Sequence, residues 1–153
     1  MPSLPYLTLD RDVQQLPSDD VAALAAQVSG GVLTAADAGY DDARKVWNAT
    51  VDRRPALIAR CRTESDVEAA VRFAAARRML LSVRSGGHHI AGNAVAEGGL
   101  MIDLSAMKTV TVDRTRARRA SAPAHCSPTS TARHRRTASR FRSESIRPPE
   151  SRA

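Results

Sequence analysis

The residues best suited to chemistry lie together in one short segment, Arg84-Ser85-Gly86-Gly87-His88-His89. The two consecutive glycines let the backbone turn sharply and approach a ligand closely. Backbone N–H groups exposed in such a turn form a concave site for an anion, and the arginine adds positive charge. The segment therefore predicts a phosphate-binding loop that carries a histidine at its tip.

Other interpretations of this segment stay open on the residues alone. Many glycine pairs form plain turns, and a histidine is often a buried structural residue. A metal site at His88 and His89 is disfavoured because adjacent residues of an extended loop point apart, so we expect no metal. Nearby, we interpret Asp103 as a strand-end turn residue and Cys61 as a packed strand residue.

The loop needs a strand to position it, and the residues before it predict one. Residues 80–83 are largely apolar, as are residues 56–61. Between these runs, Thr63 and Asp66 have the spacing of a helix-capping box, and small apolar residues follow at helical spacing as far as Arg77-Arg78. A strand–helix–strand unit normally makes a parallel crossover. Ligands of such sheets bind at the carboxyl ends of the strands, where the candidate loop begins.

The remaining elements are expected on both sides of this unit. Residues 1–17 have no clear period and contain three prolines, so we expect a mobile or loosely docked leader. Ser18 is a plausible N-cap for a helical pattern that Gly30-Gly31 ends, within an N-terminal helical segment of residues 18–50. Two further strands are expected at residues 100–104 and 109–112.

The net charge of +7 comes entirely from the last quarter of the chain. Residues 114–153 hold 11 Arg and two acidic residues, whereas the preceding residues hold 12 basic and 14 acidic ones. Apolar periodicity is lost in this last part, and such a segment buries too little surface to offset its ordering entropy. We therefore expect a disordered Arg-rich tail.

The overall composition excludes several classes of protein. A hydrophobic fraction of 42% in 153 residues is ordinary for one globular domain, and no apolar run is long enough to span a membrane. The first residues do not have the form of a signal peptide, and two cysteines are too few for a disulfide framework. These observations favour a cytoplasmic protein without a membrane partner.

Over a longer stretch, the sequence resembles a known family. The segment Val83–His88 continues into Ala91-Gly92-Asn93 and then into Gly98–Met107. Together with the strand and the capped helix before it, this string is similar to the PCMH-type FAD-binding domain of the FAD-linked oxidases. These are the berberine-bridge-enzyme-like members of the vanillyl-alcohol-oxidase superfamily. The resemblance covers residues 40–113.

The resemblance implies FAD as the cofactor and a role for each loop residue. His88 matches the histidine that bonds through a ring nitrogen to the 8α-methyl carbon of the isoalloxazine, which suits a neutral imidazole attacking the quinone-methide tautomer of the flavin. Contacts to the pyrophosphate and ribityl chain would come from Arg84, Ser85, Gly86, Gly87 and His89, while Gly92 and Asn93 would shape the loop. The implied reaction is oxidation of an alcohol, sugar or amine by hydride transfer, with oxygen often accepting the electrons.

The fold implied is α+β, the first lobe of a two-lobed flavin domain. Residues 51–113 would form this partial domain, a strand–helix–strand unit with a small, mostly parallel sheet. Family members place the catalytic base and the substrate domain later in their sequences. We therefore expect the chain alone to be inactive and poorly soluble, with weak FAD binding at best.

Two hypotheses account for residues 114–153. A basic arm would bind nucleic acid or acidic partners through its arginines, but it has no Lys and one aromatic residue, Phe141, so a stacking surface is missing. Alternatively, the reading frame is shifted near Arg114. Synonymous codons can be chosen for Arg118–Arg152 that, read two bases later, restore strand and helix periodicity. The chain would then be a non-catalytic flavin-binding fragment or a pseudogene product, and the gene sequence around Arg114 tests this.

Overall fold

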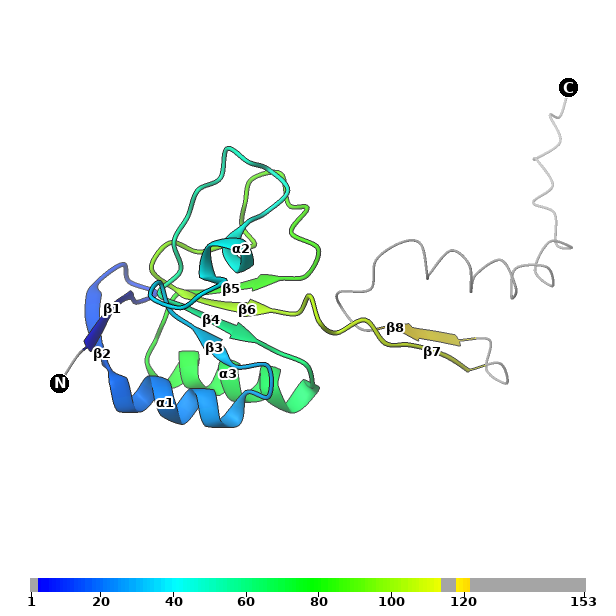
Figure 1. Ribbon diagram of the computed structural model, residues 1–153, viewed down its shortest axis with the longest axis horizontal. Helices are drawn as coiled ribbons and strands as arrows, with labels where there is room; N and C mark the ends of the chain where they lie inside the picture. Colours follow the sequence, from blue (N-terminus) through cyan, green and yellow to red (C-terminus); the bar gives the residue numbers. More distant parts are fainter. Residues whose placement is uncertain (1–2, 114–117, 122–153) are drawn as a thin grey trace, which may run out of the picture.

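The computed structural model describes residues 3–113 and 118–121. Within them, a four-stranded sheet carries two helices on one face and loops with a short helix on the other (Figure 1). The elements are β1 (Ser3–Leu7), β2 (Val13–Pro17), α1 (Ser18–Gln27), β3 (Val32–Leu33), α2 (Tyr40–Arg44), β4 (Leu57–Arg60), α3 (Glu64–Ala76), β5 (Leu81–Arg84), β6 (Leu100–Asp103), β7 (Val110–Asp113) and β8 (Arg118–Ser121). The helices of this described part are too short or too polar to cross a membrane.

The main sheet has the strand order β3-β4-β6-β5. Strands β4 and β5 both pair in parallel with β6, and β3 pairs antiparallel with β4. The predicted strand–helix–strand unit is therefore confirmed, with β6 inserted between its two strands. The strand expected at residues 109–112 is also present, but it belongs to a separate hairpin of β7 and β8.

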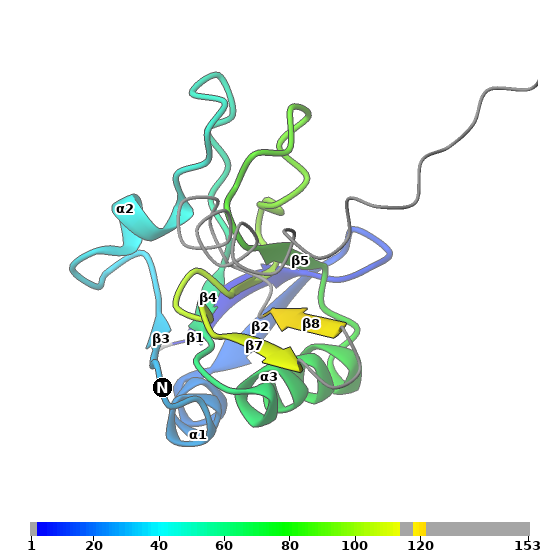
Figure 2. The ribbon, with the colours of Figure 1, turned by 90° about the vertical axis from the view of Figure 1, so that its right-hand side faces the viewer.

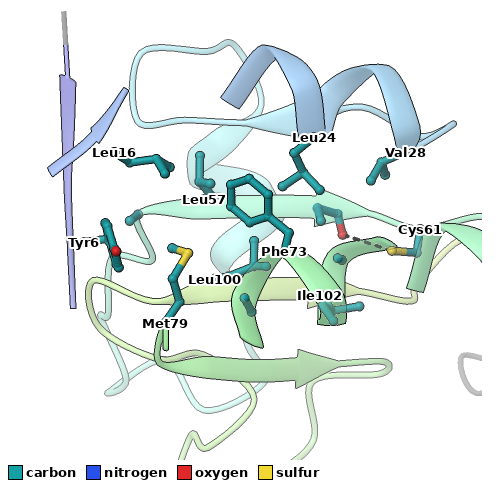
Figure 3. Close-up of a cluster of buried hydrophobic side chains, with 14 of the residues drawn as sticks. Tyr6, Leu16, Leu24, Val28, Leu57, Cys61, Phe73, Met79, Leu100 and Ile102 are labelled. Carbon is teal, nitrogen blue, oxygen red and sulfur yellow. Dashed lines mark hydrogen bonds between the residues drawn. The ribbon is translucent and has the colours of Figure 1, made fainter. Parts of the chain in front are cut away.

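The central strands are apolar because both of their faces are covered. Leu57 and Ala59 of β4 face the helices, as do Leu100 and Ile102 of β6, and all four are fully buried. Figure 3 shows this cluster between the helices and the sheet, with Phe73 of α3 among its residues. A smaller cluster covers the opposite face, built from Tyr40, Ile58, Val95 and Met101. The sheet thus holds two cores, and the candidate loop leaves it on the side of the smaller one.

Helix α3 begins with the capping box that the sequence predicts. Thr63 Oγ1 accepts a hydrogen bond from the backbone of Asp66 at 3.2 Å, and the Asp66 carboxylate accepts from the backbone of Thr63 at 3.1 Å. Ala70, Phe73 and Ala74 then turn one face of α3 into the core. Helix α1 lies beside α3 on this face of the sheet (Figure 2).

The mobile leader expected for residues 1–17 is wrong from Ser3 onward. Strands β1 and β2 form an antiparallel hairpin, and its residues Tyr6 and Leu16 are buried in the larger core. The Tyr6 hydroxyl donates to the carbonyl of Arg77 at 3.3 Å, which fixes the hairpin against the end of α3. The prolines concealed this pattern, but proline is compatible with an edge strand because that strand bonds on one side only.

Two other expectations need correction. The segment of residues 18–50 contains α1 and α2, but it also contributes β3 to the sheet. The tail is not disordered at residues 118–121, which pair with β7. A strand can form there because the hairpin supplies backbone hydrogen bonds whatever the side chains are. Residues 114–117 and 122–153, and the predictions about them, lie outside the described residues.

Candidate functional site

The candidate loop leaves the carboxyl end of β5, as the sequence predicts. Arg84 ends this strand opposite Asp103 of β6. Gly87 is buried and has a φ of 69°, in the left-handed region that favours glycine. At Gly86, an added Cβ would lie 2.6 Å from Nδ1 of His88. The imidazole of His88 therefore rests against the bare α-carbon of Gly86.

The backbone of this loop offers several unused donors. In the part of the chain that the structure describes, no protein acceptor faces the N–H groups of residues 86–89. The side chains of His88 and His89 are exposed, which contradicts the alternative of a buried structural histidine. Neighbouring free N–H groups in a turn with one left-handed residue form a site that suits an anion.

Arg84 is held by protein groups on both sides. Its Nη1 donates to Oδ1 of Asp103 at 3.0 Å, and its Nε donates to the carbonyl of Lys45 at 3.2 Å. The side chains of Arg84 and Asp103 are 18% and 5% exposed, so the carboxylate compensates much of the charge that we assigned to a ligand. Asp103 also accepts hydrogen bonds from the backbone and hydroxyl of Ser105, both at 3.0 Å, which confirms it as a strand-end turn residue.

A second loop, residues 45–54, lies along the first, as Figure 2 shows. The backbone N–H of Trp47 donates to the carbonyl of Gly87 at 3.0 Å. The amide of Asn48 donates to the carbonyl of Ile90 at 2.8 Å. Our sequence analysis missed this loop, because contacts between segments some forty residues apart leave no periodic pattern. The only signal was the single tryptophan of the chain within a polar stretch.

The later residues of the candidate loop contribute in different ways. Gly92 has a φ of 70°, and a Cβ there would lie 2.5 Å from the Val51 side chain, which is consistent with a shaping role. Arg53 supports the same turn by donating to the carbonyls of Gly92 and Val95, each at 3.1 Å. Asn93 is exposed, and its side chain has no hydrogen bond to another described residue.

Other reactive groups lie apart from this site. Cys61 is fully buried in the core with the helices, and burial raises the pKa of its thiol to about 12. Its Sγ donates to the carbonyl of Ala59 at 3.7 Å (Figure 3), so Cys61 is a packed residue, as the sequence predicts. Within the described residues, no group of three or more metal-ligating side chains comes together.

The two loops fit the anionic part of a dinucleotide such as FAD. The free N–H groups of residues 86–89 suit a pyrophosphate. The exposed His88 lies beside these donors and is available to a bound molecule.

Comparison with known proteins supports this assignment. Residues 55–124 match the family model of the FAD binding domain. This segment therefore has the sequence pattern of an FAD binding domain. The (R)-6-hydroxynicotine oxidase of Paenarthrobacter nicotinovorans is 38% identical over 86 residues, which are 56% of this chain and 19% of that protein.

Solved structures of FAD-dependent enzymes share the fold of this part of the chain. The 6-hydroxy-D-nicotine oxidase from Arthrobacter nicotinovorans matches with a TM-score of 0.67 and 32% identity, over 72% of this chain and 24% of that one. The berberine-bridge-enzyme-like protein BBE-like 1 of Physcomitrella patens has a TM-score of 0.54 and 20% identity, over 62% of this chain and 21% of that one. The predicted fold, a first lobe of an FAD-binding domain, and the predicted cofactor, FAD, are confirmed.

The similarity covers only part of the length of the relatives. The chain spans about a fifth of the length of the curated relatives that it matches. At its C-terminal end, the family match continues to residue 124, beyond residue 113 where we ended the resemblance.

Proposed function

We propose that this chain supplies the cofactor-binding part of an FAD-dependent oxidoreductase in which His88 holds the flavin covalently. The loop of residues 84–89 carries the proposal, because it combines free backbone donors with an exposed histidine at the end of a parallel strand. When bound, FAD supplies the redox chemistry, accepting a hydride from an oxidisable carbon.

Different residues of the loop contact different parts of FAD or hold the loop in place. The N–H groups of residues 86–89 receive the pyrophosphate, and the hydroxyl of Ser85 and the ring of His89 add polar contacts. Arg84 acts mainly by position, since its ion pair with Asp103 and its bond to Lys45 hold the start of the loop. Gly92 and Asn93 set the return of the loop toward the sheet.

The covalent step requires a nucleophile and an oxidant. With FAD bound, His88 would hold it through a bond from a ring nitrogen to the 8α-methyl carbon, and the imidazole and the methyl group would each give up one proton. Forming this bond is a two-electron oxidation, for which the flavin would accept the electrons and dioxygen would be the final oxidant, yielding hydrogen peroxide. The exposed imidazole suits this role.

The substrate is an alcohol, a sugar or an amine, in line with the family that the chain resembles. We place the catalytic base and the substrate-binding surface in the part of the relatives' length that this chain does not span. On this proposal, the chain alone binds flavin without turning over substrate.

The test is to incubate the purified chain with FAD in air and then precipitate it with acid. We expect flavin fluorescence to stay with the denatured polypeptide and the His88→Ala variant to lose it. His134→Ala serves as the matched control, because it removes another histidine of the same chain and leaves the sequence of residues 84–89 unchanged.

Each outcome has a distinct meaning. Flavin that binds but is released by acid contradicts the covalent role of His88 and leaves FAD binding supported. If the fraction that ultrafiltration retains with the chain shows no FAD absorbance, and acid precipitation yields no flavin, the proposed cofactor-binding function of this chain is wrong.

A further inference from the structure

We propose that residues 45–51 form a second wall of the flavin site, in which the indole of Trp47 and the side chain of Ile90 contact the isoalloxazine. This inference rests on the proposed function and extends it to a segment that carries no recognisable cofactor motif.

The starting observation is the exposure of two large apolar side chains. Ile90 is 78% exposed and Trp47 is 71% exposed, the two highest values among the large hydrophobic residues that the structure describes. They lie on different loops, 43 positions apart in the sequence. The Asn48 amide, next to Trp47, donates to the backbone carbonyl of Ile90 at 2.8 Å. The two side chains are therefore presented by loops that are joined to each other at these positions.

The backbone contacts place this pair beside the cofactor loop. The backbone N–H of Trp47 donates to the carbonyl of Gly87, the residue before His88. A Cβ added at Gly87 would lie 3.5 Å from the α-carbon of Val46, so the two loops lie close together here. Arg84 fixes the same segment through the carbonyl of Lys45. These contacts give the segment a defined position before any ligand binds.

The chemistry of the pair favours the flavin ring over the other parts of FAD. The free N–H groups of residues 86–89 suit the charged phosphates, whereas an indole and an aliphatic side chain suit a planar aromatic surface. If His88 holds the flavin, the ring is anchored one residue away from Gly87, to which the backbone of Trp47 bonds. Covering Trp47 and Ile90 would also remove two large apolar groups from water.

Trp47 is the single tryptophan among the 153 residues, so its emission reports on this site alone. We would titrate the full chain with FAD and, separately, with ADP, which has the pyrophosphate but no flavin ring. FAD is expected to quench the tryptophan emission strongly and ADP to leave it nearly unchanged. Free N-acetyltryptophanamide in the same FAD solutions corrects for light absorbed by the flavin.

Affinity measurements by ultrafiltration, made in the His88→Ala background so that FAD binds reversibly, provide the second readout. Trp47→Ala is expected to weaken FAD binding about tenfold, as the loss of one aromatic stacking partner does elsewhere, and to leave ADP binding unchanged. Trp47→Phe should retain most of the FAD affinity. Val13→Ala is the matched control, since Val13 is 64% exposed on strand β2, and it should bind FAD as the unaltered chain does.

The outcomes separate this inference from the function on which it rests. If FAD binds while tryptophan emission and the affinity of Trp47→Ala stay unchanged, the second wall is wrong and the proposed function stands. A Trp47→Ala chain that self-associates less but binds FAD normally would also overturn it, because the patch would then join copies of the chain. If the chain binds no FAD, both ideas fail together.

Discussion

At the scale of single residues, Gly86 and His88 form one unit. The imidazole of His88 occupies the space that a side chain at Gly86 would fill. This close packing gives the glycine pair a role beyond flexibility, because it decides where the histidine ring can rest. The orientation of the nucleophile therefore depends on a residue with no functional group.

We predict that Gly86→Ala slows flavin attachment at least tenfold while the fold is kept. The new methyl group would lie 2.6 Å from Nδ1 of His88, and the exposed ring can swing away without disturbing the core. Acid-stable flavin measured over time gives the rate, and urea unfolding is expected to change by less than about 1 kcal/mol. An unchanged attachment rate in the folded variant would show that the ring position does not matter.

The candidate site could be predicted from the sequence only where its residues are neighbours in the chain. Residues 84–89 are consecutive and follow an apolar strand, so composition and order reveal them. The roles of Trp47, Asn48 and Arg53 depend on contacts across some forty residues, which a local pattern does not encode. The pairing of Arg84 with Asp103 was hidden in the same way, since it depends on the register of β5 and β6.

At the scale of elements, one carboxylate links α1 to α3. Asp66 is 3% exposed and accepts four hydrogen bonds, from the backbones of Ser29, Arg62 and Thr63 and from the hydroxyl of Ser29. Burial alone would raise the pKa of Asp66, but these hydrogen bonds outweigh it and hold the pKa far below its usual value. The capping box that the sequence predicts is thus also a tie between two helices.

We predict that Asp66→Asn lowers the free energy of unfolding by about 2 kcal/mol at pH 7, because an amide cannot accept the same set of bonds. The folded-state pKa is depressed, so the stabilisation is fully present above the unfolded value of about 3.9 and is lost as the pH falls below it. The difference between the two chains in urea unfolding should therefore shrink progressively as the pH falls below about 4. Asp12→Asn, at an exposed position, should show neither effect. A difference in unfolding free energy that stays constant with pH would contradict the negative charge assigned to Asp66 in the folded chain.

The helices and strands could be predicted from the sequence where burial imposes a regular spacing of apolar residues. The β4–α3–β5 unit has apolar runs and a cap, and it was found within a few residues. The β1–β2 hairpin was missed because its prolines masked a short alternation, and only packing against Arg77 and the core shows its role. The position of β6 between β4 and β5 could not be read from order along the chain.

At the scale of the molecule, the family match bears on the hypothesis of a shifted reading frame. The match extends to residue 124. If the frame is lost, the extent of this match favours a position near or after residue 124 instead of near Arg114. The nucleotide sequence beyond that point remains the direct test.

The edge of the main sheet sets the expected solution behaviour. Strand β5 ends the strand order of the described sheet, and its Val83 side chain is 52% exposed. Exposed apolar edge strands promote association between chains. We predict that Val83→Lys raises the monomer fraction in size-exclusion chromatography, whereas Val71→Lys on helix α3, at 42% exposure, does not. Equal gains from both variants would mean that added charge alone improves solubility.

The strand order also has a consequence during synthesis. Strands β4 and β5 leave the ribosome before β6, yet each forms its parallel ladder only with β6. A nascent chain that ends before residue 100 therefore has helix α3, a strand β4 that is paired only with the two residues of β3, and an unpaired strand β5. Because such non-local pairing is slow, the emerging polypeptide exposes its apolar strands until the last of them arrives. The nascent chain is thus most dependent on chaperones shortly before its cofactor loop can be positioned.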